Sequence, residues 1–171
     1  MKRILVMSDT HLSRDITLPD ILLKHLNMVD IVIHAGDFTS YEVYNYLKRL
    51  KPLVACWGNN DDWRLKQELP DKVLVPIEGV NIGLCHGHGI SIGLSRAQNT
   101  LNRAITTFST QDVNLVIFGH SHKCQLEEIN GVTYYNPGSA TNKRFEPEYS
   151  FGIITVEAGK FDIKTYFYKT Y

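Results

Sequence analysis

The sequence predicts an α/β domain in which strands and helices alternate and build mixed sheets. Three observations support this fold class. Apolar runs recur along the first 120 residues, amphipathic stretches separate several of them, and the rest of the chain holds paired runs joined by tight-turn residues. Buried parallel strands read as apolar runs, whereas hairpins give antiparallel strands, so both kinds of pairing are expected. We expect one domain over residues 1–171.

Five apolar runs are the predicted buried strands. Each is dominated by apolar residues and leads into glycine or polar residues. In chain order they are RILVMSD, DIVIHAGD, LVACWGN, NIGLCHGH and NLVIFGHSH.

Three amphipathic stretches between these runs are predicted helices. Pro19 precedes the first, and proline is favourable at a helix start because its missing N–H needs no partner there. Ser40 is a suitable N-cap for the second helix over residues 41–50. The third is expected from about Ser95, with apolar residues at helical spacing up to Phe108.

Two hairpins are predicted after residue 123. Asn130-Gly131 is the strongest short signal for a type I′ turn, and Ala158-Gly159 joins two alternating runs in the same way. These four strands should therefore pair antiparallel.

Composition excludes several classes of function. The 18 basic and 18 acidic residues give no polycationic surface, so we expect neither a nucleic-acid polymer nor a membrane as partner. Asp9 interrupts the apolar amino-terminal run too early for a signal or membrane segment, which predicts a cytoplasmic protein. Cys56, Cys85 and Cys124 lack paired spacing and are expected to be reduced thiols.

All five predicted strands end in residues that bind metal ions. Open α/β sheets place their sites at the carboxyl ends of strands, so ligands distant in sequence would meet at one rim. Several occur in pairs two residues apart, which extended backbone directs to the same side. The residues are Asp9, His11, Asp37, Asn59, His86, His88, His120 and His122.

Each of these residues alone also has an ordinary structural explanation. An acid can cap a helix or a turn, and a histidine after a strand is commonly a hydrogen-bonded core residue. His34 keeps that interpretation, with support of a ligand as its alternative. Because five consecutive strand ends share the pattern, a metal site is the better prediction.

The ordered motifs SDTH, HAGD, GNND, CHGHG and GHSH, followed by NPGS at residues 136–139, resemble the calcineurin-like metallophosphoesterases. Within that family they are similar to the small bacterial and archaeal phosphodiesterase branch, and the match spans nearly the whole chain. The resemblance implies a four-layer α-β-β-α sandwich with two mixed β-sheets. The NPGS turn is expected to have a structural role.

The resemblance also implies a site for two divalent metal ions per chain. Three ligands would hold each ion, and one carboxylate would bridge them. Imidazole, carboxylate and amide ligands suit Mn, Ni, Zn, Co or Fe, and manganese is the ion we expect. The first ion would be held by Asp9, His11 and His122, the second by Asn59, His86 and His120, and Asp37 would be the bridge.

Three further residues are catalytic candidates. Asn60 stands where larger phosphatases of the family have a histidine that protonates the leaving group, and an amide cannot donate that proton near neutral pH. Asp61 is expected to orient the loop through hydrogen bonds, and Asp62 to begin a helix. His88 is a candidate for phosphate contact or proton donation, or else a packed histidine.

The expected activity is a metal-dependent phosphodiesterase that hydrolyses small phosphoesters. A hydroxide bridging two divalent ions would attack phosphorus in line. The positive charge of two such ions exceeds the negative charge of Asp9 and Asp37, so the site would attract phosphate within a neutral protein.

Two alternatives remain open. A phosphomonoesterase or nucleotide pyrophosphohydrolase would use the same centre, with Lys143 and Arg144 reaching a second phosphate or forming a solvated pair. A retromer-subunit-like interaction scaffold shares the family resemblance, although relatives of that kind have lost metal ligands.

An aromatic edge is predicted near the carboxyl terminus. It would support a homodimer or homotetramer, as in other members of the branch, and packing against the fold is its alternative role. The residues are Tyr166, Phe167, Tyr168 and Tyr171.

Overall fold

The computed structural model describes residues 1–13 and 16–170, and its ten strands form two sheets of five. The first sheet has the order β10-β9-β1-β2-β3. Strands β1, β2 and β3 run parallel, with β3 at the edge of the sheet. Strands β9 and β10 form an antiparallel hairpin, and β9 pairs antiparallel with β1. The strands are β1 (Lys2–Met7), β2 (Ile31–His34), β3 (Leu53–Ala55), β9 (Tyr149–Glu157) and β10 (Lys160–Tyr168).

The second sheet has the order β4-β5-β6-β8-β7. Strands β5, β6 and β8 are parallel, and the edge strands β4 and β7 pair antiparallel with their neighbours. The strands are β4 (Lys72–Ile77), β5 (Val80–Cys85), β6 (Leu115–Ile117), β7 (Cys124–Ile129) and β8 (Val132–Pro137).

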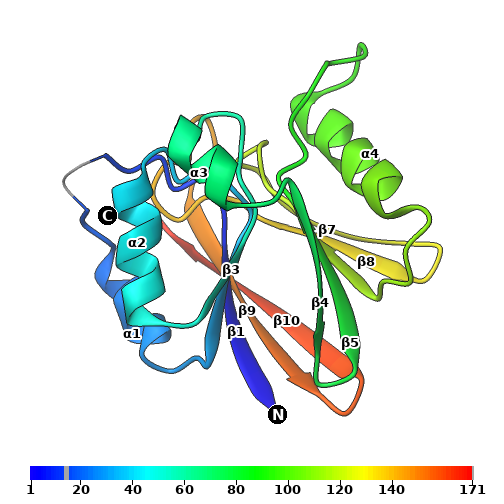
Figure 1. Cartoon of the computed structure of the whole chain (residues 1–171), viewed down its shortest axis with the longest axis horizontal. Coiled ribbons are helices and arrows are strands. Elements are labelled where there is room, and N and C mark those ends of the chain that lie inside the picture. Colours follow the sequence, from blue (N-terminus) through cyan, green and yellow to red (C-terminus); the bar gives the residue numbers. More distant parts are fainter. Residues whose placement is uncertain (14–15, 171) are drawn as a thin grey trace.

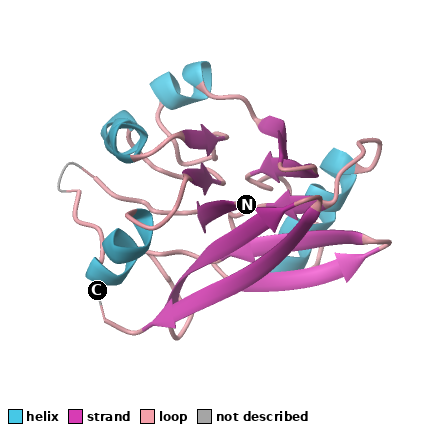
Figure 2. Ribbon diagram, turned by 90° about the horizontal axis from the view of Figure 1, so that it is seen from below, coloured by secondary structure: helices cyan, strands magenta, loops and turns pink. Residues whose placement is uncertain are grey.

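Helices cover the outer faces of both sheets (Figures 1 and 2). Helices α1 (Asp20–Leu26) and α2 (Tyr41–Leu50) pack on the first sheet, and α4 (Arg96–Phe108) packs on the second. The short α3 (Trp63–Glu68) follows the loop after β3. This arrangement confirms the predicted α/β sandwich with two mixed sheets.

Alternation along β1 shows how the layers form. Leu5 and Met7 face α1 and α2, whereas Ile4 and Val6 enter the core between the sheets. The inner core is completed from the second sheet by residues such as Leu84, and all of these side chains are fully buried. The sandwich is therefore held by apolar packing on both faces of its first sheet.

Helix starts agree with the sequence prediction in position but not always in capping. Ser95 caps α4 by accepting a hydrogen bond from Gln98 N at 3.2 Å. Ser40 occupies the N-cap of α2, but its side chain makes no capping bond. Asp62 takes over this function, because its carboxylate accepts hydrogen bonds from Tyr41 N and from Leu65 N, each at 2.9 Å. One acid thus serves the starts of both α2 and α3.

The hairpin predictions are confirmed, and one strand was missed. Asn130-Gly131 and Ala158-Gly159 have the paired positive φ angles of type I′ turns. Strand β4 was not predicted; it contains Pro76, which is tolerated because β4 is an edge strand.

The cysteines and the helices bear on two further predictions. Cys56 and Cys85 are buried, Cys124 is half-buried, and all three are free thiols as predicted. In the described part of the chain no helix has the length and apolarity needed to cross a membrane.

The predicted aromatic edge is mostly packed into the fold. The Tyr166 ring stacks on Phe151 with centroids 5.3 Å apart, and Tyr168 packs against the same core. Phe167 is exposed, and Tyr171 lies outside the described residues. The homodimer or homotetramer stays a prediction.

The core between the sheets gives a stability prediction. Leu84 is fully buried there, whereas Leu126 on β7 is 52% exposed. We expect Leu84→Ala to lower the free energy of unfolding by about 2–5 kcal/mol, because it leaves a cavity. The matched Leu126→Ala should cost less than about 0.5 kcal/mol. Urea denaturation measures both, and equal losses would contradict the assignment of the main core.

Candidate functional site

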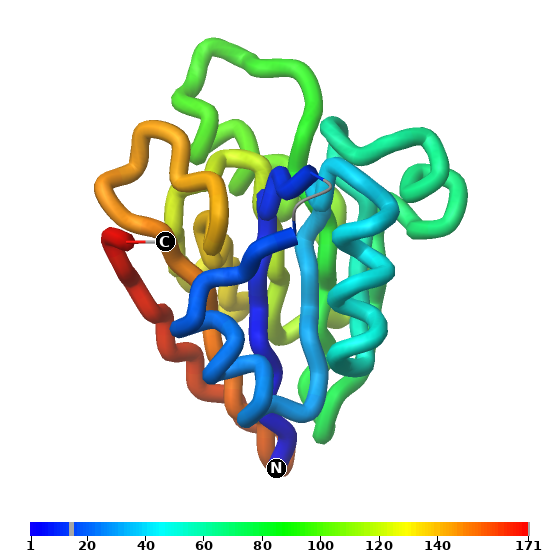
Figure 3. The backbone as a smooth tube through the Cα atoms, turned by 90° about the vertical axis from the view of Figure 1, so that its left-hand side faces the viewer, coloured from blue at the N-terminus to red at the C-terminus, as the bar shows by residue number. Residues whose placement is uncertain are grey.

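The loops that follow the parallel strands gather at one end of the sandwich, opposite the amino terminus (Figure 3). The predicted ligands lie in these loops. Asp9 and His11 follow β1, Asp37 follows β2, His86 follows β5, and the pair His120 and His122 follows β6. Both sheets therefore contribute side chains to the same rim.

The backbone of this rim is held in an unusual conformation. Non-glycine residues with positive φ are uncommon, and such strain concentrates at functional sites. Five of the predicted ligands share this feature, and Thr39 in the loop after β2 has it as well (86°). The five ligands are Asp9 (52°), His11 (45°), Asp37 (58°), His120 (66°) and His122 (62°).

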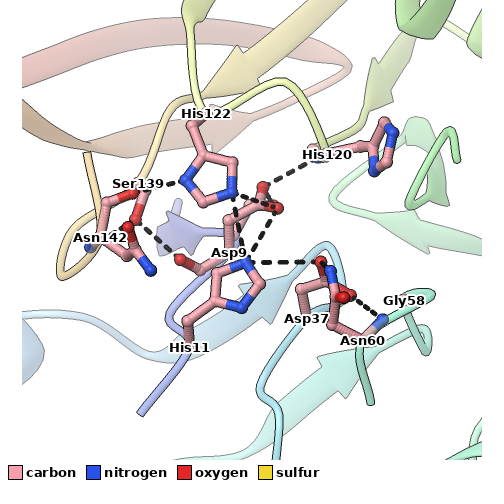
Figure 4. Close-up of polar contacts among 12 residues, drawn as sticks. Asp9, His11, Asp37, Gly58, Asn60, His120, His122, Ser139 and Asn142 are labelled. Carbon is pink, nitrogen blue, oxygen red and sulfur yellow. Dashed lines mark hydrogen bonds and ion pairs between the residues drawn. The ribbon is translucent and has the colours of Figure 1, made fainter. Parts of the chain in front are cut away.

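Asp9, His11 and His122 form a first compact group of ligand atoms. Figure 4 shows their side chains pointing toward one another. Asp9 Oδ1 lies 3.8 Å from His11 Nε2 and 3.4 Å from His122 Nε2, and the two imidazole nitrogens are 3.2 Å apart. Ligand atoms bound to one ion at about 2.0–2.2 Å have roughly this mutual spacing. The group can hold one metal ion.

Asp37, His86 and His120 form a second group whose ligand atoms lie within 4.8 Å of one another. Asp37 Oδ2 is 3.3 Å from His86 Nε2 and also 3.4 Å from His11 Nε2 of the first group. The Asp37 carboxylate therefore lies between the two groups, which is the position that a bridging ligand requires.

Hydrogen bonds to the second ring nitrogens fix how the imidazoles are presented. His86 Nδ1 donates to Ala35 O at 2.7 Å, and His122 Nδ1 donates to the carbonyl oxygen of Asn142. In the neutral ring these bonds leave Nε2 with its lone pair toward the site, as metal-binding histidines require.

Two buried polar atoms support metal binding directly. Asp9 Oδ1 and His86 Nε2 are buried and make no hydrogen bond among the described residues, although each has an oppositely charged group of the site within 3.3–3.4 Å when the histidine of that pair is protonated. Leaving such atoms unpaired costs free energy, because each has lost its contact with water. Both face the groups described above, so the residues present fit divalent metal ions.

The pKa values of the site reflect burial and the two carboxylates. Burial raises the pKa of Asp9 to about 6, and the charge of Asp37 adds to the rise. Burial opposes protonation of His86, but Asp37 and Asp9 outweigh it and raise the pKa of His86 to about 9. Burial lowers the pKa of His120 to about 3 and that of His122 to about 4. His120 and His122 are thus neutral and ready to bind a cation at pH 7.

The loop after β3 gives its two asparagines different contacts. Asn60 contacts the bridging candidate, since its backbone N and its Nδ2 donate to the Asp37 carboxylate at 2.8 and 2.6 Å. Asn59 is exposed, and its carbonyl oxygen accepts a hydrogen bond from Lys66 Nζ at 2.8 Å. A metal-binding role for Asn59 stays a prediction, and the side-chain amide that hydrogen-bonds to Asp37 belongs to Asn60.

Asp61 holds this loop against the site. Its carboxylate accepts hydrogen bonds from the backbone N–H groups of Asp37, Thr39 and Gly58 at 2.7–3.1 Å. Gly58 is required at this place because a Cβ there would overlap Asp37. These contacts are what an orienting role of Asp61 requires.

The two remaining histidines differ in position. The His88 ring lies 5.5 Å from His86 and 6.4 Å from His120 between centroids, so it borders the second group. His34 is fully buried beneath the site; its Nδ1 accepts from Gly36 N at 3.2 Å, and its ring stacks on Phe38. Its Nε2 lies 3.2 Å from Oγ1 of Thr10, which stands between the candidate ligands Asp9 and His11, so the contacts of His34 agree with both of its predicted interpretations.

Several supporting residues lie outside the predicted set. Ser8 Oγ donates to Asp9 Oδ2 at 2.5 Å, and Ser139 Oγ of the NPGS turn donates to Asp9 O at 2.7 Å. Asn136 Nδ2 donates to Gly119 O at 2.8 Å, so the turn has the structural role expected of it. Ser8 belongs to the SDTH motif, which was a signal, whereas the Asn142 carbonyl leaves no signature in sequence.

Comparison with known proteins identifies relatives over most of the chain. A family model described as the calcineurin-like phosphoesterase superfamily domain matches residues 1–159. A probable metallophosphoesterase of Methanocaldococcus jannaschii is 33% identical over 140 residues, which cover 81% of this chain and 68% of the relative. A phosphodiesterase of the same organism is 32% identical over 145 residues, which cover 78% and 81%.

A solved structure shows the same fold. Wild-type Vps29 of Entamoeba histolytica, crystallised with Zn²⁺, superposes with a TM-score of 0.73 and 25% sequence identity. The alignment covers 96% of this chain and 98% of that protein.

The raised pKa of His86 predicts proton release on metal binding. A ligand imidazole must be neutral, and His86 in the metal-free protein is protonated below about pH 9. Mn²⁺ should therefore displace about one proton at pH 7.5, and its affinity should rise as pH increases toward 9. Calorimetric titration in two buffers of different ionisation enthalpy counts the protons. His86→Asn should lose this release, and no release from the unmodified protein would contradict the assignment.

Proposed function

The chain belongs to the calcineurin-like phosphoesterase superfamily, and we propose that it is a metal-dependent phosphodiesterase acting on small phosphoesters. The observation that carries this proposal is the position of Asp37 Oδ2, 3.4 Å from His11 Nε2 of one ligand group and 3.3 Å from His86 Nε2 of the other. A carboxylate shared by two adjacent groups is suited to a centre of two ions rather than one.

The chain's own residues would assemble and tune this centre. Two divalent ions, when bound, supply an activated water and positive charge for the phosphate oxygens. Asp9, His11 and His122 would hold one ion, His86 and His120 the other together with Asn59, and Asp37 would be shared by both. Because His120 and His122 have lowered pKa values, they would bind without first losing a proton at neutral pH.

The residue at position 60 bears on which substrates turn over. Asn60 donates both of its hydrogen bonds to Asp37 and offers no acidic proton for a leaving group. Substrates with good leaving groups would therefore react most readily, unless His88 or water supplies the proton. Small phosphodiesters with acidic alcohols or phenols fit this requirement best.

An interaction scaffold is the second candidate, favoured by the structural likeness to Vps29. It accounts less well for the buried Asp9 Oδ1 and His86 Nε2, which have no hydrogen-bond partner in the described residues. A surface used only for protein contacts does not need unpaired polar atoms inside the rim. Catalysis therefore stays the first proposal.

The first test removes the bridging carboxylate. Asp37→Ala should lower metal-dependent hydrolysis of a bis-aryl phosphodiester by more than about 100-fold, because it takes a ligand from both ions. Rates are measured after chelation and after restoring Mn²⁺, Ni²⁺ or Zn²⁺, with the matching monoester in parallel.

Asp162→Ala is the matched control, since it removes an exposed carboxylate from β10. It should leave the rate unchanged. Absence of turnover of either ester with any of the three metals, despite two bound ions per chain, would overturn the phosphodiesterase proposal.

A second test restores the missing proton donor. Asn60→His should raise kcat for diesters with alkyl leaving groups by roughly 100-fold, since general acid catalysis typically contributes about 10²–10⁴. Diesters with nitrophenyl leaving groups should change little. The contrary result would come from His88→Ala with Asn60 retained. If that variant loses alkyl-diester turnover, His88 is the donor and the interpretation of Asn60 is wrong.

A further inference from the structure

A cavity of about 470 Å³ lies directly beside the candidate metal site. His86, a candidate ligand, and His88 both line it. Its volume falls within the range of about 300–1,000 Å³ that is typical of small-molecule pockets. The cavity is therefore large enough to hold a substituent of a molecule whose phosphate is bound at the rim.

The walls of the cavity have a distinct chemistry. Trp57, two residues after the end of β3, contributes an indole whose ring centroid lies 4.8 Å from that of His88. Helix α4 contributes hydrogen-bonding side chains, among them Asn102 and Thr106, and Lys72 enters from the start of β4. An aromatic face with polar groups around it is suited to a flat ring rather than to an alkyl chain.

The loop over residues 87–95, which supplies Ile92 to the cavity, is fixed from α4. In Figure 1 this loop leads into α4 and extends above it at the upper right. Asn99 is only 6% exposed; its Oδ1 accepts from Ile92 N at 3.2 Å, and its Nδ2 donates to Leu94 O at 2.8 Å. Arg103 donates to His88 O at 3.3 Å and to the carbonyl oxygen of Ile90.

These bonds have a consequence for recognition. They tie the backbone on both sides of Ile92 to a single rigid helix, so this wall exists before a ligand arrives. A wall already in place reduces the ordering cost of binding.

We propose that this cavity binds one ester substituent of the substrate and selects a planar aromatic or heteroaromatic ring, which stacks on Trp57. The inference rests on the proposed function, because it places the phosphate of the same molecule at the candidate metal ligands. Trp57 is then a specificity-determining residue, whereas Asn99 and Arg103 are positioning residues that hold the cavity wall.

The test compares two phosphonates that differ only in the ring. Binding of phenylphosphonate and methylphosphonate to the full chain loaded with Mn²⁺ is measured by calorimetry. We expect phenylphosphonate to bind at least about tenfold more tightly, since stacking on an aromatic side chain has about this effect. Trp57→Ala should abolish the preference, and Trp57→Phe should keep most of it.

A second variant fills the cavity from helix α4. Thr106 is exposed on α4 and lines the cavity, so Thr106→Trp should block phenylphosphonate while methylphosphonate binds as before. Thr110→Trp adds the same bulk just after the end of α4, outside the lining residues, and should change neither affinity. This pair keeps the test decisive if Trp57→Ala fails to fold.

The outcomes separate this inference from the proposed function. Equal affinity for the two phosphonates, or a preference that survives both Trp57→Ala and Thr106→Trp, overturns the cavity as a ring-binding site even if diesters are hydrolysed. Ring-selective binding without turnover of any phosphoester supports the cavity and overturns the proposed activity. Binding of neither phosphonate overturns the cavity as a ring-binding site, whereas the proposed activity is decided by the turnover assays alone.

Discussion

Two buried carboxylates at the ends of neighbouring parallel strands set the conditions for the rest of the site. Asp9 follows β1 and Asp37 follows β2, and both side chains are almost completely buried. Like charges in such a place require compensation, because water is excluded and cannot screen them. In the metal-free protein the compensation comes from His86, whose pKa is raised to about 9, and from Asp9, whose pKa is raised to about 6. Divalent cations would answer the same requirement.

The surrounding backbone keeps these charges in place. Each left-handed non-glycine residue costs about 1–3 kcal/mol, so the rim persists only because other contacts determine it. Asp61 supplies three of those contacts to the β2 and β3 loops, and Ser139 supplies one to the backbone of Asp9. The turn after β8 thus supports the rim through hydrogen bonds to its backbone.

Much of this architecture could be predicted from sequence, because burial and turn chemistry leave strong patterns. The strands ahead of the ligands, three of the helices and two type I′ turns follow from apolar runs, caps and Asn-Gly or Ala-Gly pairs. Strand β4 was missed because Pro76 argues against a central strand, and its edge position is a property of the whole sheet.

What the sequence could not resolve was local geometry. Adjacent asparagines in the turn Gly58-Asn59-Asn60-Asp61 have the same chemistry, and only the folded loop shows that Asn60 faces Asp37. The cap of α2 came from Asp62, which is 21 residues from its partner and therefore invisible to a local rule. The cavity beside His86 likewise depends on how α4 packs against β5 and the loop between them.

The origin of the ligands in two different sheets has a mechanical consequence. His11 extends from the first sheet and His122 from the second, 111 residues apart in the chain, and the second group is divided in the same way. An ion bound by either group is a cross-link between the two halves of the sandwich, one that closes a long loop of chain as a disulfide would. Because its three cysteines are free thiols, this fold has no covalent tie of that kind. The availability of metal would then determine how strongly the two sheets are held together at the rim. The same binding event would serve both catalysis and the stability of the sandwich.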